Sequence, residues 1–383
     1  MTHSSMNRRC WFSLLTGAGL SAGYAVAQNS LPPEPARSAG QGRRKSPEVK
    51  LPPYDKKPRV SCIHGVDRRK NAYEALKAIE DQIAPAIKSK KYILIKPNDV
   101  STQRQLASTH VDALRGIIDF CEPYRKPVVI AESSAGNTRD AYDSFFYDRL
   151  PSEYKGLGVE LVDLNQEGLY EVFHILDADL HPVPVRLAKR LFDPEAFILC
   201  SAILKTHNTV VATLSIKNMT LGAPLRSGPE VPRNQRWNDK RHYHGGVRQT
   251  NYGMMLTAQK MAPFWGATLI DGFEGMEGNG PGSGTPVDSK LAIASADYVA
   301  ADRVGVEVMG IDPAWLGYLN FCNEVGLGQY DLSKIEIVGS KLENVKRKYL
   351  LHKDIDRELQ WMGPMEELPP RLGSIRTEGL GYG

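Results

Sequence analysis

Apolar segments of strand length alternate with segments of helical periodicity between residues 59 and 342 of this chain. Two apolar segments lie at 92–99 and 127–134, and residues 111–118 between them carry apolar side chains at helical spacing. Such alternation is typical of parallel sheets, because each strand returns to its starting edge through a helix. The sequence therefore predicts an α/β fold: a mostly parallel sheet with helices on both faces and long inserted loops.

The most informative stretch runs from Ile203 to Gly222, directly after an apolar segment that predicts a buried strand. The residues in it that could bind a ligand or transfer a proton are Lys205, Thr206, His207, Lys217 and Asn218. In open α/β sheets, ligands bind beyond the carboxyl ends of the strands, and lysine and histidine suit an anion and a proton there. The other interpretation is a solvated turn with ordinary surface lysines.

Two further strand ends carry polar residues of the same kind. Lys96 and Asn98 close the segment at 92–99, and Ser133 and Ser134 close the segment at 127–134. His110 precedes a helix, and His244 lies in a long polar loop, 226–246, of a length typical of functional loops. We predict His110, His207, Lys205 and Lys217 as catalytic residues, and Lys96, Asn98, Ser133, Ser134, Thr206, Asn218 and His244 as substrate-binding residues.

Two carboxylates are candidate metal ligands. Asp271 closes an apolar strand at 265–272, and Glu277 lies in the glycine-rich segment that follows. Carboxylates at such a place can hold a divalent cation or a proton, although a tight-turn loop would show the same residues. The cofactor stays unknown at this stage. None of the five cysteines forms a CxxC pair, so the sequence carries no iron–sulfur or zinc-ribbon motif.

The two ends of the chain differ from its middle. Residues 1–27 combine adjacent arginines, a short apolar stretch and an Ala-Val-Ala end, which predicts a twin-arginine-like signal peptide; an ordinary secretory signal is the alternative. The apolar stretch is too short for a membrane span. Residues 28–58 predict a linker rich in proline and basic residues, and residues 343–383 a charged, partly irregular tail. We expect an exported, periplasmic or extracytoplasmic protein without a stable membrane span after signal removal.

Five motifs in order give the chain a family resemblance. They are KPN at 96–98, TH at 109–110, KTHNTVVATLSIKN at 205–218, DGFEGMEGNGPGSG at 271–284 and ASADYVAAD at 294–302. In these motifs the chain resembles the domain-of-unknown-function family numbered 362, over residues 59–340. The resemblance implies no assigned reaction. Many relatives carry ferredoxin-like iron–sulfur modules, which this sequence lacks, and the family is distantly similar to nickel-dependent lactate racemases in its order of lysines and histidines.

Two classes of function follow. The first is an enzyme that uses lysine and histidine at strand ends on a small anionic substrate, a carboxylate or a phosphate, with or without a metal. The alternative is a non-catalytic protein that is associated with a metal or an iron–sulfur centre and binds a redox partner protein. A distant racemase-like nickel enzyme is a further alternative. The net charge of +4 is too small to indicate a nucleic-acid partner.

Overall fold

The computed structural model describes residues 57–228 and 230–363. The predicted signal peptide, nearly all of the predicted linker and the last twenty residues of the predicted tail lie outside the described residues, so the export route stays a prediction. Within the described part of the chain, no helix has the length and apolar character that crossing a membrane requires.

A nine-stranded sheet forms the centre of the fold, in the order β11-β1-β10-β9-β7-β2-β3-β4, with β8 paired to β7. Strands β9, β7, β2, β3 and β4 run parallel to one another, whereas β10 is antiparallel to both of its neighbours. The predicted α/β class with a mostly parallel sheet is confirmed. The strands are β1 (Arg59–His64), β2 (Tyr92–Lys96), β3 (Val128–Glu132), β4 (Glu160–Asp163), β7 (Ala196–His207), β8 (Val211–Thr213), β9 (Trp265–Glu277), β10 (Thr285–Ser295) and β11 (Glu336–Gly339).

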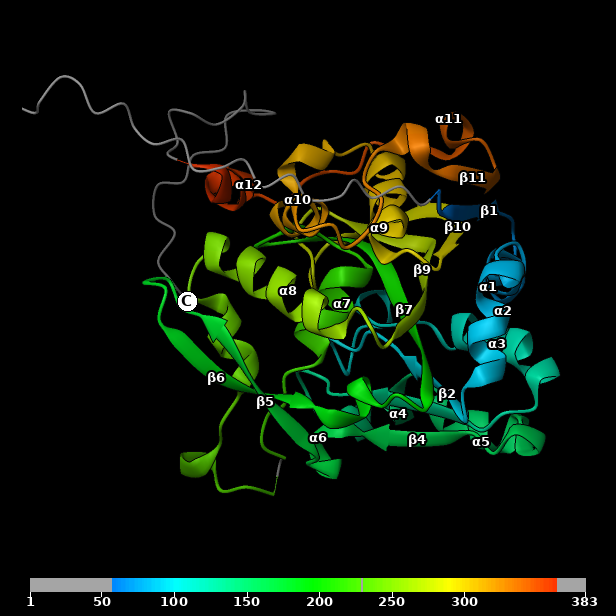
Figure 1. Cartoon of the computed structure of the whole chain (residues 1–383), viewed down its shortest axis with the longest axis horizontal. Helices are drawn as coiled ribbons and strands as arrows, with labels where there is room; N and C mark the ends of the chain where they lie inside the picture. Colours follow the sequence, from blue (N-terminus) through cyan, green and yellow to red (C-terminus); the bar gives the residue numbers. More distant parts are fainter. Residues whose placement is uncertain (1–56, 229, 364–383) are drawn as a thin grey trace, which may run out of the picture. The chain divides into compact units, whose positions relative to one another are not determined.

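Helices cover both faces of this sheet, because successive strand residues point to opposite sides. In β2, Ile93 and Ile95 belong to one core cluster and Leu94 to the other. Figure 1 shows α1–α3 on one side and α7–α10 on the other. The first cluster packs under α1 (Arg68–Lys77), α2 (Glu80–Ser89), α3 (Val111–Cys121) and α4 (Thr138–Ser144), and the second under α7 (Ser215–Gly222), α8 (Val247–Met261), α9 (Tyr298–Val308) and α10 (Gly317–Glu324).

The described chain also contains four one-turn α-helices, α5 (Leu150–Glu153), α6 (Leu164–Glu167), α11 (Leu342–Val345) and α12 (Ile355–Glu358), and several short 3-10 helices. One predicted strand proves longer than expected. Strand β9 continues through Asp271 to Glu277, because the segment predicted as a loop pairs with the first residues of β10. The apolar alternation that marks the first half of β9 stops at Gly272, so the sequence did not show this extension.

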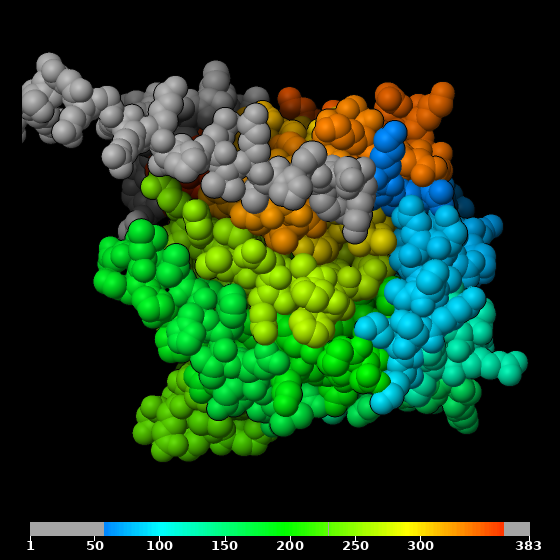
Figure 2. Space-filling model, viewed as in Figure 1, coloured from blue at the N-terminus to red at the C-terminus, as the bar shows by residue number. Residues whose placement is uncertain are grey.

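A separate hairpin of β5 (Tyr170–Leu176) and β6 (Pro182–Ala188) supports the long polar loop 226–246. The Arg186 guanidinium donates to both carboxylate oxygens of Asp239, at 2.8 and 2.9 Å, and its carbon lies 3.4 Å from the ring centre of Trp237. These contacts fix the loop against the hairpin. Figure 2 shows the green hairpin at the edge of the viewed surface, where Tyr170 and Val172 are exposed.

Candidate functional site

A cavity of about 880 Å³ opens at the carboxyl ends of β2, β3 and β7. Its walls combine these strand ends with α7, the loop 226–246 and residues around α12. The polar and charged residues that line it are Lys96, Asn98, Asp99, Glu132, Ser133, His207, Asn208, Thr209, Lys217, Asn218, Asn238, Lys240, Arg241, His244, Arg357 and Gln360. Seven of the eleven residues predicted to catalyse or bind substrate therefore share one cavity.

A fully buried ion pair forms the floor of the cavity. The Lys96 ammonium donates to both carboxylate oxygens of Glu132, at 3.0 and 3.1 Å, and to the Asn218 side-chain oxygen at 3.1 Å. The Ser133 N–H also donates to Glu132, at 2.8 Å. A Cβ at Gly222 would stand 2.2 Å from the Lys96 ammonium, so only glycine allows this close approach. The Lys96–Glu132 pair is therefore a rigid floor in which the two charges balance each other.

Lys205 lies behind the floor of the cavity and does not line the cavity itself. Its ammonium donates to the Asn98 side-chain oxygen at 2.7 Å and to the Ala107 carbonyl at 2.8 Å. The Asn98 amide in turn donates to Asn218 at 2.9 Å. Burial, together with the charge of Lys217, holds the pKa of Lys205 well below its usual range. Its contacts indicate that Lys205 orients Asn98 rather than touching a ligand.

Lys217 faces the cavity. It is 7% exposed, and its ammonium makes no hydrogen bond or ion pair with any residue in the described ranges 57–228 and 230–363. Burial and the nearby Lys96 lower its pKa to about 8. A buried ammonium group without a partner is costly, so this position is suited to an incoming anion.

Lys240, from the loop 226–246, adds a second cation. Its ammonium donates to the Ser133 hydroxyl at 3.0 Å and to the Leu221 carbonyl at 3.1 Å, both of them neutral acceptors. Burial lowers the pKa of Lys240 to about 7, against the opposing charge of Glu132. Since the Glu132 carboxylate is already bonded to Lys96, Lys240 adds positive charge to the cavity that is not neutralised.

Two histidines face the cavity in opposite tautomers. His207 Nδ1 accepts the Thr209 N–H at 3.1 Å, so a neutral His207 carries its proton on Nε2. His244 Nδ1 lies 2.9 Å from the Lys240 carbonyl and must donate to it, which leaves Nε2 as an acceptor. Burial and the charge of Lys217 hold the pKa of His207 well below its usual range, so it stays neutral. The two rings thus supply one hydrogen-bond donor, His207 Nε2–H, and one proton acceptor, His244 Nε2.

The other predicted residues lie outside the cavity lining. His110 and Asp271 border a second, water-sized hollow, where Asp271 pairs with Arg68 at 3.3 Å. Thr206 bonds the Gly278 carbonyl at 2.9 Å. Glu277 accepts the Leu350 N–H at 2.8 Å. Ser134 donates its N–H to Thr138 at 3.2 Å. Asp271, Thr206 and Glu277 thus use their side chains in bonds within the fold, whereas the Ser134 bond involves only its backbone.

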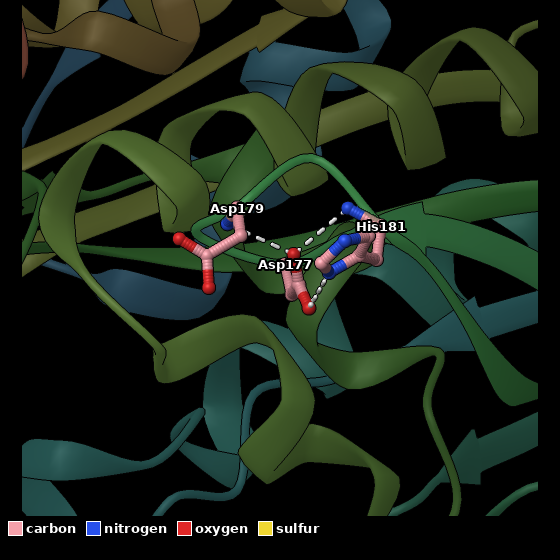
Figure 3. A group of neighbouring side chains, drawn as sticks. All are labelled: Asp177, Asp179 and His181. Carbon is pink, nitrogen blue, oxygen red and sulfur yellow. Dashed lines mark hydrogen bonds and ion pairs between the residues drawn. The ribbon is translucent and has the colours of Figure 1, made fainter.

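Among the described residues, three side chains have donor atoms close enough together to hold a metal ion: Asp177, Asp179 and His181. Figure 3 shows them on the turn between β5 and β6. One Asp177 oxygen accepts the N–H groups of Asp179 and His181, at 2.9 and 2.8 Å. This bonding is that of an ordinary aspartate-stabilised turn, and the group lies outside the cavity lining.

Sequence reasoning missed nine of the sixteen polar and charged lining residues, among them Glu132, Lys240, Arg357 and Gln360. The first two had signals, since Glu132 directly precedes Ser133 and Lys240 lies in the long polar loop. The other two come from the segment expected to be an irregular tail. Arg357 reaches the cavity because its guanidinium donates to the Asn208 carbonyl at 2.8 Å, a tertiary contact without a local sequence signal.

Comparisons with known proteins give the following similarities. The model of the family described as domain of unknown function (DUF362) matches residues 93–307. A thylakoid-associated protein of Synechocystis sp. is 30% identical over 145 residues, 37% of this chain and 41% of that protein. The chain thus spans about two fifths of the length of this curated relative.

Two solved structures are distantly similar. The lactate racemase apoprotein of Thermoanaerobacterium thermosaccharolyticum is 14% identical and aligns over 68% of this chain and 59% of its own, with a TM-score of 0.39. A protein of Thermotoga maritima is 9% identical and aligns over 54% of this chain and 52% of its own, with a TM-score of 0.34.

Proposed function

The chain belongs to the family of domain of unknown function 362, and we propose that it is an enzyme that binds a small anionic substrate in this cavity and moves a proton on it. One observation carries the proposal: Lys217 presents a buried ammonium to the cavity with no partner among the described residues. Because leaving a buried cation unpaired is unfavourable, a ligand of opposite charge is its natural counterpart.

The roles follow from the contacts. Lys217 and Lys240 bind the anionic group, and Asn218 and Ser133, which line the same wall, fix its orientation. The neutral His207 donates a hydrogen bond from Nε2–H to a substrate oxygen, and His244 accepts a substrate proton at Nε2 and returns it. The Lys96–Glu132 pair holds the floor in place and takes no part in the chemistry.

The first test is binding. We expect carboxylates or phosphate esters from a metabolite panel to raise the melting temperature of the purified full chain, and Lys217→Met to abolish the shift. Lys155→Met, a change at an exposed lysine outside the cavity lining, is the matched control. Equal shifts for the wild type and the Lys217 variant would remove the anion site from the proposal.

The second test is catalysis. Ligands that bind are incubated with the protein in D₂O and followed by NMR for deuterium incorporation or conversion. We expect turnover by the wild type and its loss in His244→Gln, which has no titratable nitrogen to accept the substrate proton. Binding without any turnover across the panel, or full turnover in the variant, would contradict the catalytic role.

A further inference from the structure

We infer that the anionic group held in this cavity is a phosphate, and that the substrate is a phosphate ester whose organic part fills the remaining space. This inference rests on the proposed function and narrows its substrate class. Three features of the described residues lead to it: a helix N-terminus at the cavity, the unpartnered lysine beside it, and an excess of positive charge over the available carboxylates.

The helix is α8, fifteen residues long, whose first residues border the cavity through Gly246 and Val247. Its N-cap makes no side-chain hydrogen bond. Within the described ranges, no residue accepts a hydrogen bond from the N–H groups at 247, 248 or 249. A Cβ built at Gly246 would meet no atom within 4 Å, so open space lies against this turn. Free N–H groups and the positive end of a helix dipole together favour an anion.

Lys217 is the independent observation that points to a ligand at the same place. Its buried ammonium comes from α7, which packs against α8, and it has no partner among the described residues. His244, two residues before the N-cap of α8, has a pKa lowered by burial and by the charges of Lys217 and Lys240. The two lysines and the helix N-terminus therefore border the same cavity.

Charge balance favours a dianion. Three cationic side chains line the cavity outside the Lys96–Glu132 and Arg357–Asp354 ion pairs: Lys217, Lys240 and Arg241. The remaining lining carboxyl is Asp99, and burial together with the charge of Glu132 holds its pKa well above the usual range, so it adds little negative charge. A monocarboxylate would neutralise one cation, whereas a phosphate neutralises about two and offers more acceptor oxygens for N–H groups.

The size of the cavity requires more than the phosphate. At about 880 Å³, it lies near the upper end of the range for small-molecule pockets, roughly 300–1,000 Å³. Arg357 and Gln360 form part of its wall from around α12, beyond the strand ends that carry Lys96 and Ser133. An organic group attached to the phosphate would occupy this space.

The inference is tested by calorimetric titration of the full chain with four probes: inorganic phosphate, sulfate, acetate and phenyl phosphate. We expect phosphate and sulfate to bind at least tenfold more tightly than acetate, and phenyl phosphate more tightly than phosphate. Phosphate binding near pH 8 should take up protons, because the anion raises the pKa of a lysine that titrates at about 8. Acetate binding as tightly as phosphate would overturn the inference.

Two variants separate the contribution of the α8 N-terminus to phosphate binding from that of Lys217. Val247→Pro removes one N–H at the first position of α8, where proline is tolerated, and should weaken phosphate binding severalfold without lowering the melting temperature. Lys217→Met should weaken it at least tenfold, and Lys155→Met should leave it unchanged. Unchanged phosphate affinity in both site variants would show an adventitious interaction elsewhere and overturn the inference.

The outcomes also separate this inference from the proposed function. Preference for acetate, with dependence on Lys217 and turnover of a carboxylate, would keep the proposed enzyme and reject the phosphate. Tight phosphate binding that depends on Val247 and Lys217, without proton exchange on any phosphate ester, would keep the phosphate site and reject the enzyme.

Discussion

Replacing Lys96 by methionine should test the buried floor of the cavity most directly. Lys96 is fully buried and Glu132 is 3% exposed, with 3.0 Å between the ammonium and the nearer carboxylate oxygen. At that distance, two unit charges interact by about 5 kcal/mol at an effective dielectric constant of about 20, but by about 1.4 kcal/mol in water. Removing Lys96 leaves Glu132 buried with one donor among the described residues, the Ser133 N–H.

The expected loss in the free energy of unfolding is therefore about 3–5 kcal/mol for Lys96→Met, the usual cost of an unpaired buried charge. An exposed pair supplies the control: Lys91 and Glu195 are closer, at 2.7 Å, but their side chains are 78% and 48% exposed. Lys91→Met should cost far less than Lys96→Met, because solvent screens that pair. Burial rather than distance decides the difference.

Equilibrium unfolding in urea, followed by circular dichroism, measures both losses. The double variant Lys96→Met/Glu132→Gln should lose less than the sum of its single variants, because each single change leaves the other partner unpaired. If Lys96→Met costs no more than Lys91→Met, or if the single losses simply add, the floor is not held by this ion pair and the reasoning is refuted.

Three further predictions concern stability. Gly222→Ala places a Cβ 2.2 Å from the ammonium of the buried pair and should cost about 1–3 kcal/mol in urea unfolding, whereas Gly282→Ala, which meets no atom within 4 Å, should cost far less. Glu358→Leu removes the acceptor of the Val211 N–H at 2.7 Å and should cost about 1–3 kcal/mol, while Glu358→Gln keeps an oxygen acceptor and should cost less; equal losses would contradict this. Lys217 has a pKa of about 8 when folded, below the ordinary 10.5, so the unfolded chain binds more protons and stability rises with pH from about 8 to 10.5. Lys217→Met should therefore be more stable than the wild type at pH 7, by at most about 3 kcal/mol, and the difference in melting temperature should shrink towards pH 10.5.

Much of the fold and half of the site follow from local sequence, because strand ends in a parallel sheet converge by geometry. Lys96, Ser133 and His207 reach one cavity for this reason. Strand alternation should also have excluded Thr206, since it neighbours Lys205 and His207 in β7 and points to the opposite face. Applying strand alternation to the sequence would therefore have removed Thr206 from the predicted substrate-binding residues.

The remaining residues depend on contacts between distant segments. Lys205 shares the face of His207, yet Asn98 and the Ala107 carbonyl enclose it, and neither contact has a sequence signal. Arg357 reaches the cavity through the Asn208 carbonyl. Glu358 fixes the same segment by accepting the N–H of Val211, whose φ of +68° is unusual for a branched side chain. Such positions are set by packing across more than a hundred residues of chain, which periodicity cannot express.

Lys217 and Lys240 connect the stability of this protein with its proposed activity. Leaving Lys217 buried without a counter-charge lowers the stability of the empty protein, and adding Lys240 to the same cavity increases the repulsion. An anion that binds only the folded state would offset this loss of stability. At a free concentration of a hundred times its dissociation constant, the anion adds about 2.7 kcal/mol to the free energy of unfolding. Lys217→Met, which no longer binds the anion, should then be more stable than the wild type without ligand. Its stability should not increase when the anion is added. A purely structural lysine would show neither change, so measuring both in Lys217→Met separates a binding role from a packing role.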